Sequence, residues 1–369
     1  MPQKTRVLVV DDSAIFRRVL TGMLSDQPDI EVIGSAPDPF VARDLILELR
    51  PDVLTLDLEM PRMDGLAFLK RLMRYRPLPV IVISSIAPTG CRIALEALRL
   101  GAVEVLVKPG GPLSPSGTLS VDELGDQLVK TVRAAARAKV VARHAPPEQV
   151  SGVRPQASIT SFPGQSLIVI GASTGGVDAI REIVVRLPAN CPPTLVVQHI
   201  PKGFTRPFAE YLSRISGLEV REAGNVEELA SGRILIAPGD SHLELRGTNG
   251  KRCAMLSNAA PCNHHRPSID VLFQSVARYS AKHVVGVVLT GMGADGAEGL
   301  LALRKGGAAT IAQDKESSVV YGMPAEAVRI GAAQTVLPLK DIAGGILSAL
   351  APEPAALTVA RKTQLGGSL

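Results

Sequence analysis

The chain has 369 residues, a formal net charge of +5 and 46% apolar residues. At roughly 150 residues per domain, this length predicts two or three domains, each with enough apolar content for a core. The apolar runs fall well short of the ~18 residues that cross a bilayer, and the first residues lack the pattern of a signal peptide. We therefore expect a soluble, cytoplasmic protein without membrane insertion.

Cysteine and charge patterns exclude two further classes. The four cysteines are widely spaced and form no Cys-x-x-Cys pair, which argues against a disulfide framework and a zinc site. The positive surplus lies within residues 127–160, where six Lys or Arg stand against one acid. Aromatic residues make up only 3% of the chain and no helix-turn-helix pattern follows, so we expect a solvated helix face and no nucleic-acid partner.

The first part of the chain alternates short Val, Ile and Leu runs with helical patterns, which is typical of a parallel α/β domain. The expected strands are residues 6–10, 31–34, 53–58, 80–84 and 104–107. The expected helices are residues 13–25, 39–49, 65–75, 90–100 and 121–142. We assign residues 1–143 to this domain and predict that the proline-containing stretch 144–163 is an interdomain linker.

A second α/β series occupies residues 164–352 and predicts a doubly wound, mostly parallel domain. Its expected strands are residues 167–170, 194–198, 219–222, 233–236, 284–290, 308–312 and a short piece near Val336. Residues 242–246 and 252–256, joined by Gly-Thr-Asn-Gly, predict an antiparallel hairpin within this series. Residues 353–369 lack periodicity, and we expect a flexible tail there.

Polar residues follow the ends of the expected strands in the first domain. Asp11 and Asp12 follow the first strand, Asp57 the third, Ser84 the fourth and Lys108 the fifth. In a parallel sheet these ends share one edge, where open α/β folds place their sites. Three carboxylates there need a cation between them, and oxygen ligands suit Mg²⁺. One carboxylate can then attack phosphorus while an ammonium and a hydroxyl hold the transferred oxygens.

The same residues occur as Val-Asp-Asp-Ser, Leu-Asp-Leu-Glu-Met-Pro-Arg-Met-Asp-Gly, Ile-Ser and Val-Lys-Pro. In this order and spacing they resemble the receiver domains of two-component response regulators. The resemblance implies a five-stranded, flavodoxin-like fold in which Asp57 accepts a phosphoryl group. It further implies that Mg²⁺ is held by Asp11, Asp12, Asp57 and the backbone carbonyl of Glu59, and that Ser84 and Lys108 contact the phosphoryl oxygens. Many receivers carry an aromatic residue where Val105 stands, so no aromatic switch is assumed.

A glycine-rich turn opens the second domain, because Gly171-Ala-Ser-Thr-Gly-Gly176 follows its first strand. Small residues permit a tight strand-to-helix turn that exposes Ser173 beside free backbone N–H groups, which can stabilise an oxyanion. Such turns also bind phosphates, so this motif alone leaves both interpretations open. A serine nucleophile needs a base, and His199 ends the next strand at the same edge. The other histidines are His144, His242, His264, His265 and His283.

A carboxylate that orients the imidazole should end another strand, and Asp295 follows the strong strand 284–290. Competing acids are Asp178, Asp240 and Asp270. Ser268, Asp270, Arg206 and His242 can shape a substrate cleft or make loop and cap hydrogen bonds with similar probability. We add the hypothesis that the backbone N–H groups of Thr174 and Met292 donate to the oxyanion.

The second domain resembles the catalytic domain of the CheB family of chemotaxis methylesterases. The resemblance rests on Gly-Ala-Ser-Thr-Gly-Gly, Gln-His-Ile-Pro, Ala-Pro-Gly-Asp-Ser-His-Leu, Arg-Pro-Ser-Ile-Asp-Val-Leu-Phe, Thr-Gly-Met-Gly-Ala-Asp-Gly and Ser-Ser-Val-Val-Tyr-Gly-Met-Pro, in this order. It implies Ser173 as nucleophile, His199 as general acid and base, and Asp295 as orienting acid. It also implies hydrolysis of glutamyl methyl esters and deamidation of glutamines on methyl-accepting chemoreceptors, without an esterase metal. A CheA-type histidine kinase would be the phosphodonor, and phosphorylation would release a receiver that blocks the catalytic edge.

Three other classes of protein share part of this pattern. The pattern Gly171-x-Ser173-x-Gly175 also fits α/β-hydrolases, but their triad runs serine, acid, histidine, and the early His199 disfavours that order. A nicotinamide-binding Rossmann domain is disfavoured for two reasons. Its glycine spacing differs from that of residues 171–176, and this sequence has no clear acid after the second strand to bind a ribose. A non-enzymatic output module that docks when phosphorylated is the third alternative.

Overall fold

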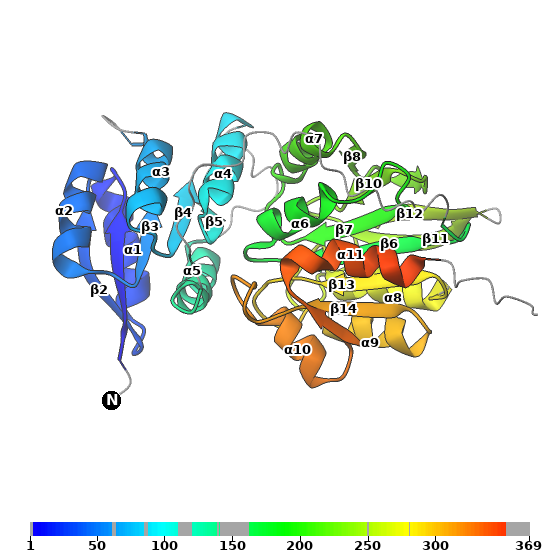
Figure 1. The fold of residues 1–369 in the computed structure, drawn as a ribbon. Coiled ribbons are helices and arrows are strands. Elements are labelled where there is room, and N and C mark those ends of the chain that lie inside the picture. The colour runs from blue at the N-terminus through cyan, green and yellow to red at the C-terminus, as the bar shows by residue number, and fades with distance from the viewer. Residues whose placement is uncertain are drawn as a thin grey trace, which may run out of the picture.

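The computed structural model describes residues 3–60, 64–84, 88–109, 120–138, 140, 162–248, 251–279 and 281–351. The chain folds into two α/β units that lie side by side (Figure 1). None of the helices in these ranges is long and apolar enough to cross a membrane. The expected linker (144–163) and tail (353–369) lie almost entirely outside the described residues.

The N-terminal unit is a parallel sheet flanked by helices on both faces (Figure 1). The strand order β2-β1-β3-β4-β5 is that of flavodoxin-like domains, so the predicted receiver fold is confirmed. Its elements are β1 (Thr5–Val10), α1 (Ala14–Ser25), β2 (Ile30–Ala36), α2 (Pro39–Leu49), β3 (Val53–Leu56), α3 (Gly65–Tyr75), β4 (Val80–Ser84), α4 (Pro88–Leu100), β5 (Glu104–Val107) and α5 (Val121–Ala135).

The C-terminal unit contains a larger parallel sheet with the order β15-β14-β13-β6-β7-β10-β8 within the described residues. The elements of its first half are β6 (Leu167–Ala172), α6 (Gly176–Val184), β7 (Thr194–Gln198), α7 (Thr205–Ser216), β8 (Glu219–Glu222), β9 (Val226–Glu228), β10 (Arg233–Ile236), β11 (His242–Thr248) and β12 (Lys251–Ser257). Those of its second half are α8 (Ile269–Tyr279), β13 (Val284–Val288), α9 (Ala297–Lys305), β14 (Ala309–Gln313), α10 (Met323–Arg329), β15 (Thr335–Leu337) and α11 (Leu339–Leu350).

The predicted hairpin is present as β11 and β12, but it does not join the large sheet. It pairs with the short strand β9 to form a separate antiparallel sheet in the order β11-β12-β9. The sequence gave no sign of β9, because Val-Glu-Glu is too short and too polar to show strand periodicity. The last receiver helix was expected to continue to residue 142 but ends at Ala135, where Arg137 and Ala138 donate to carbonyls three residues earlier.

Both parallel sheets reverse their winding direction at a strand pair that leads to predicted site residues. In the receiver, β1 is flanked by β2 and β3, and in the second sheet β6 is flanked by β7 and β13. Ligand sites of open α/β folds form at the carboxyl ends of strands at such reversals. The sheet topology therefore places Asp11 and Asp57 together, and Ser173 near Asp295.

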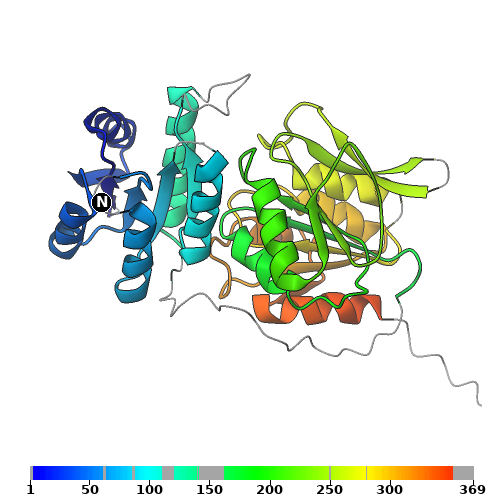
Figure 2. The same ribbon diagram turned by 90° about the horizontal axis from the view of Figure 1, so that it is seen from above.

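The two units share a packed apolar interface. Helix α4 contacts both α6 and α7, and the two views agree that α4 stands between the sheets (Figures 1 and 2). Ala94 and Leu98 of α4 belong to the same buried cluster as Ile200 and Phe204. The Arg99 guanidinium also lies 4.2 Å from the centre of the Tyr211 ring, a cation–π distance.

We predict that Gly171→Ala destabilises the C-terminal unit. A Cβ at Gly171 would lie 2.3 Å from Ile269 Cγ2, so α8 would have to move away from β6. Overpacking of this kind costs about 1–3 kcal/mol. Thermal unfolding followed by calorimetry should give a lower melting temperature for this variant. Gly344→Ala is the control, since its Cβ would meet nothing within 4 Å; an equal loss there would contradict the steric argument.

Candidate active site

Three acidic side chains and one lysine meet at the carboxyl edge of the receiver sheet. Lys108 Nζ lies 2.7 Å from Asp11 Oδ2 and 2.6 Å from Asp57 Oδ2. One oxygen from each of Asp11, Asp12 and Asp57 falls within 4.8 Å of the others. Asp11 and Asp57 are buried, whereas Asp12 is exposed. The expected acid cluster is therefore present, and the lysine ammonium contacts two of its carboxylates.

The electrostatics of this cluster favour a bound cation. Burial raises the pKa of Asp57, although Lys108 and the Glu59 N–H, 3.1 Å from Asp57 Oδ1, pull it down. Burial alone would lower the pKa of Lys108, but its hydrogen bonds to Asp11 and Asp57 leave that pKa raised. Carboxylate oxygens gathered this closely are the ligands that a hard divalent cation prefers, so the residues fit a divalent metal site.

The other predicted receiver residues lie at the same edge. Ser84 is the last residue of β4 and is buried, and its carbonyl accepts a hydrogen bond of 3.0 Å from the Lys108 N–H. Val105, at the position where many receivers carry an aromatic residue, is 3% exposed and packs in the receiver core.

Ser173 lies in the turn between β6 and α6. Its N–H donates to the Thr290 carbonyl at 3.0 Å, and its own carbonyl accepts from Gln198 Nε2 at 2.8 Å. Gly175, which precedes α6, has a φ of +77°, and a Cβ there would lie 2.6 Å from Val319 Cβ. The turn is therefore tied to both neighbouring strands and requires glycine at Gly175.

His199 reaches the same edge from β7. Ala172 pairs with Gln198, and the His199 N–H donates to the Ala172 carbonyl at 3.0 Å. Ser173 and His199 thus each follow the last paired residue of two adjacent strands. His199 Nε2 lies 2.9 Å from Asp295 Oδ2. The structure therefore brings the three predicted residues to one edge, with the histidine and the aspartate in hydrogen-bond contact.

The Asp295 carboxylate is buried and receives several hydrogen bonds besides that of the histidine. Oδ1 accepts from Ser268 Oγ at 2.8 Å, from Asn263 Nδ2 at 3.0 Å and from the Asp270 N–H at 3.2 Å. Oδ2 accepts from the Ile269 N–H at 2.7 Å, so the N-terminus of α8 faces the charge. Burial alone would raise the pKa of Asp295, but these donors and the histidine hold it well below its usual range.

The two ring nitrogens of His199 have different surroundings. Nε2 contacts Asp295, whereas Nδ1 is buried and has no hydrogen-bond partner among the described residues. This is the reverse of the chymotrypsin arrangement, in which the aspartate contacts Nδ1. His265 stacks on the ring with centroids 3.9 Å apart and planes at 10°. Burial, followed by the neighbouring His199, lowers the pKa of His265 to about 4, so this second ring is neutral at pH 7.

The two backbone amides that we expect to act as oxyanion donors flank Ser173. Thr174 is the next residue, and Met292 follows Gly291, at which a Cβ would lie 2.6 Å from Ser173 Cβ. Within the described part of the chain, neither amide donates a hydrogen bond. Both N–H groups therefore stay candidates for this role.

The remaining predicted cleft residues divide into two groups. Ser268 and Asp270 contact the Asp295 carboxylate, and His242 Nδ1 accepts from the Ser268 N–H at 3.1 Å. These three residues, from the start of β11 and the N-terminus of α8, belong to the polar surroundings of the carboxylate. Arg206 lies instead on the exposed face of α7, where it forms an ion pair of 3.2 Å with the glutamate one turn later.

Sequence reasoning missed several residues of this site. Asn263 and His265 come from an irregular loop before α8, which has no periodicity to predict its path. The run Asn-His-His ahead of Arg-Pro-Ser-Ile-Asp is the signal that was available. Glu104 of the receiver was also missed, because nothing in its own strand indicates a contact with the other domain.

The receiver covers the catalytic edge. A cavity of about 290 Å³ lies between the units and is lined by Val103 and Glu104 from the receiver and by Ser173 and Asp178 from the other side. Thr174 Oγ1 donates to Glu104 Oε2 at 2.7 Å across this boundary. Ser173 is 8% exposed.

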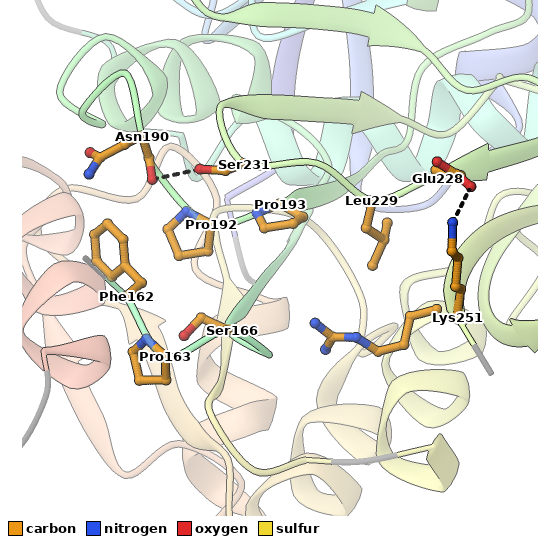
Figure 3. A pocket seen from close by; sticks show the side chains of 12 residues that line it. Phe162, Pro163, Ser166, Asn190, Pro192, Pro193, Glu228, Leu229, Ser231 and Lys251 are labelled. Carbon is orange, nitrogen blue, oxygen red and sulfur yellow. Dashed lines mark hydrogen bonds and ion pairs between the residues drawn. The ribbon is translucent and has the colours of Figure 1, made fainter. Parts of the chain in front are cut away.

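A larger cavity of about 600 Å³ lies elsewhere (Figure 3). Its lining includes Ser166, which precedes β6, and Pro193, which precedes β7, so it opens at the amino edge of the sheet. The residues predicted to be catalytic end these strands at the carboxyl edge. Size alone would select this larger cavity, whereas Ser173, the predicted nucleophile, lines the smaller one.

Comparison with known proteins agrees with these two units. The family described as response regulator receiver domain matches residues 7–113, and the family described as CheB methylesterase matches residues 168–346. The chain is thus a receiver domain joined to a domain of the methylesterase class.

Full-length relatives narrow this class. Protein-glutamate methylesterase/protein-glutamine glutaminase 2 of Syntrophus aciditrophicus (strain SB) is 48% identical over 344 residues, which cover 93% of this chain and 98% of that protein. Protein-glutamate methylesterase/protein-glutamine glutaminase 4 of Anaeromyxobacter dehalogenans (strain 2CP-C) is 50% identical over 348 residues, which cover 94% and 95%. The chain belongs to the family of protein-glutamate methylesterases/protein-glutamine glutaminases.

Solved structures match one unit at a time. The crystal structure of the Thermotoga maritima CheB methylesterase catalytic domain is 40% identical, with a TM-score of 0.49, and covers 50% of this chain and 97% of that one. The response regulator domain of Thermotoga maritima CheB is 41% identical, with a TM-score of 0.34, and covers 37% of this chain and 99% of that one.

We predict that His265 makes the stability of the C-terminal unit depend on pH. Its pKa is about 4 in the folded protein but ~6.5 in the unfolded chain, so the unfolded state binds the additional proton. The free energy of unfolding should therefore fall, by up to about 3 kcal/mol, as the pH drops from about 6.5 to about 4. In His265→Asn the decrease in the free energy of unfolding that His265 causes should be absent. Urea unfolding of both proteins at several pH values measures this difference. The exposed neighbour provides the control, since His264→Asn should keep the wild-type pH dependence.

Proposed function

We propose that this protein hydrolyses γ-glutamyl methyl esters on helical segments of methyl-accepting chemoreceptors, and deamidates glutamine side chains there, in chemotaxis or a related pathway. The observation that carries the proposal is the buried, ionised Asp295 held against His199 at the sheet edge that also carries Ser173. Acyl transfer by a serine needs this arrangement, because the carboxylate stabilises the imidazolium that forms. The names of the relatives support the choice of substrate.

Each residue has one role in the proposed mechanism. His199 Nδ1 takes the proton of Ser173 Oγ while Oγ attacks the ester carbonyl carbon, and the N–H groups of Thr174 and Met292 donate to the oxyanion. The imidazolium then protonates the methoxy oxygen, and methanol leaves an acyl-enzyme. Water, deprotonated by the same imidazole, attacks this intermediate and releases the glutamate side chain and the serine. An amide loses ammonia by the same steps.

The receiver is proposed to control this reaction. A histidine kinase of the CheA type would transfer a phosphoryl group to Asp57, with Ser84 and Lys108 contacting its oxygens. The proposed ligands of Mg²⁺, which would neutralise charge during that transfer, are Asp11, Asp12, Asp57 and the backbone carbonyl of Glu59. The proposed site of both reactions is the cytoplasm, without nucleic acid or membrane insertion.

The packing of the two units supports the proposal that the unphosphorylated receiver inhibits the esterase. The α4–β5 side of the receiver lies over Ser173, and the cavity of about 290 Å³ between them is too small for a receptor helix, whose diameter with side chains is ~10–12 Å. The acyl phosphate adds about one to two negative charges next to Lys108 and can shift a two-state interface toward the open form.

We predict that Ser173→Ala abolishes methanol release from methylated receptor membranes, by a factor of about 10³ or more. The fold should survive, because the serine main chain makes the hydrogen bonds that fix the turn. Ser231→Ala, the same substitution at the larger cavity, should keep wild-type turnover. Normal signalling by a Ser173→Ala protein in cells would favour a non-enzymatic docking module instead.

We predict that a small-molecule phosphodonor with Mg²⁺ raises the methanol release rate of the wild-type protein and leaves Asp57→Asn at its basal rate. The asparagine cannot form an acyl phosphate, while its size preserves the packing of the edge. Measuring both proteins with and without Mg²⁺ tests the metal separately. If the phosphodonor stimulated the wild-type protein and Asp57→Asn equally, the proposed control through phosphorylation of Asp57 would be overturned, whereas the proposed esterase activity would not.

A further inference from the structure

Glu104 is the feature that the proposed chemistry leaves unused. It is the first residue of β5, and its carboxylate extends from the receiver to the catalytic turn, where Oε2 accepts from Thr174 Oγ1 at 2.7 Å. Its other oxygen accepts from the Val105 N–H at 3.2 Å. Among the described residues no lysine or arginine forms an ion pair with it, although a partly buried carboxyl group usually has such a partner.

Chemistry and position together indicate what this side chain imitates. A glutamate side chain is the product of the proposed reaction, and Thr174 adjoins the nucleophile Ser173. Consecutive Cα atoms are 3.8 Å apart, so the residue that holds the Glu104 carboxyl group is the immediate chain neighbour of the serine that would carry the acyl group. Glu104 and Ser173 also line the same cavity.

We propose that the Thr174 hydroxyl recognises the side-chain carbonyl group of the substrate, and that Glu104 occupies this contact in the closed protein as an internal mimic of the glutamate product. The receiver then blocks the site with the same functional group that the enzyme processes. Thr174 becomes a specificity residue through its side chain, in addition to its proposed main-chain role at the oxyanion.

The surroundings of Glu104 support a site for neutral glutamyl groups. Burial raises the pKa of Glu104 to about 7, even though the hydrogen bond from Thr174 lowers it. Two more acids, Asp178 and Glu316, line the same cavity. Such a place disfavours a carboxylate and accepts a neutral ester or amide. The site at Thr174 would bind a glutamyl ester or a glutamine amide and repel the charged glutamate product. It holds the Glu104 carboxyl group only as long as the interface keeps the two units together.

The first test measures opening without reference to activity. In the unphosphorylated full chain, hydrogen exchange of segment 171–180 should quicken roughly tenfold in Glu104→Ala and in Thr174→Val, because each loses one buried hydrogen bond. The double variant should exchange no faster than either single one, since both remove the same contact. Glu104→Gln and Thr174→Ser keep an acceptor and a donor and should stay near wild type. Glu48→Ala, an exposed glutamate on α2, is the matched control. Unchanged exchange in Glu104→Ala overturns the proposal.

The second test addresses substrate recognition and rests on the proposed esterase function. With a phosphodonor present, Thr174→Val should raise KM for methylated receptor membranes about tenfold while kcat changes less than threefold, and Thr174→Ser should restore KM. If Thr174→Val exchanges hydrogen faster but keeps the wild-type KM, then Glu104 only holds the two units together, and the proposed mimicry of the product is overturned. If the wild-type protein releases no methanol even with a phosphodonor, the esterase proposal is overturned, and the proposed mimicry of the product is overturned with it. The hydrogen-exchange data would still report on the contact between Glu104 and Thr174.

Discussion

One buried negative charge, that of Asp295, organises the sheet edge that carries Ser173 and His199. An ionised carboxylate can be removed from water only if donors replace the lost hydration. Here the donors come from separate parts of the chain: the ring of His199, the loop amide of Asn263, the hydroxyl of Ser268 and the first main-chain N–H groups of α8. Each of these segments is consequently fixed in position by the same charge. The contact with the aspartate orients the histidine through Nε2, while Nδ1 has no hydrogen-bond partner in the part of the chain that the structure describes.

The sequence carried enough information to predict both sheets and the convergence of the polar strand ends. Buried parallel strands appear as short apolar runs, and parallel strands must end at a common edge, so Ser173, His199 and Asp295 were predictable from position alone. The loop residues Asn263 and His265 were not, because an irregular backbone follows no repeat. Strand β9 was missed for a related reason, since it gains its partners from β12 rather than from its own pattern. The roles of the site residues stay predictions, as do the limits of the domains.

The contacts between the two units are the part of the structure that local sequence patterns cannot predict. Helix α4 has an apolar stripe of the kind that any receiver helix uses for its own sheet, yet part of its surface packs on Ile200 and Phe204. Glu104 belongs to a strand whose alternation gives no reason to assign it a partner outside the receiver. Its carboxyl group lies near Thr174 because two separate sheets meet there. Interfaces of this kind depend on shape and charge over many residues, so they emerge only when both surfaces are seen together.

The direction of β5 has a consequence for where the acid cluster lies. The strand meets the catalytic unit at its first residue, Glu104, whereas Lys108 follows its last residue at the far edge of the receiver sheet. At about 3.3 Å per residue these two points are roughly 13 Å apart. Asp12, the exposed member of the acid cluster, stays at the surface while the units are packed together. The acid cluster therefore lies at the receiver edge away from the Glu104 contact, and the packing of the two units leaves that edge, with Asp12, at the surface.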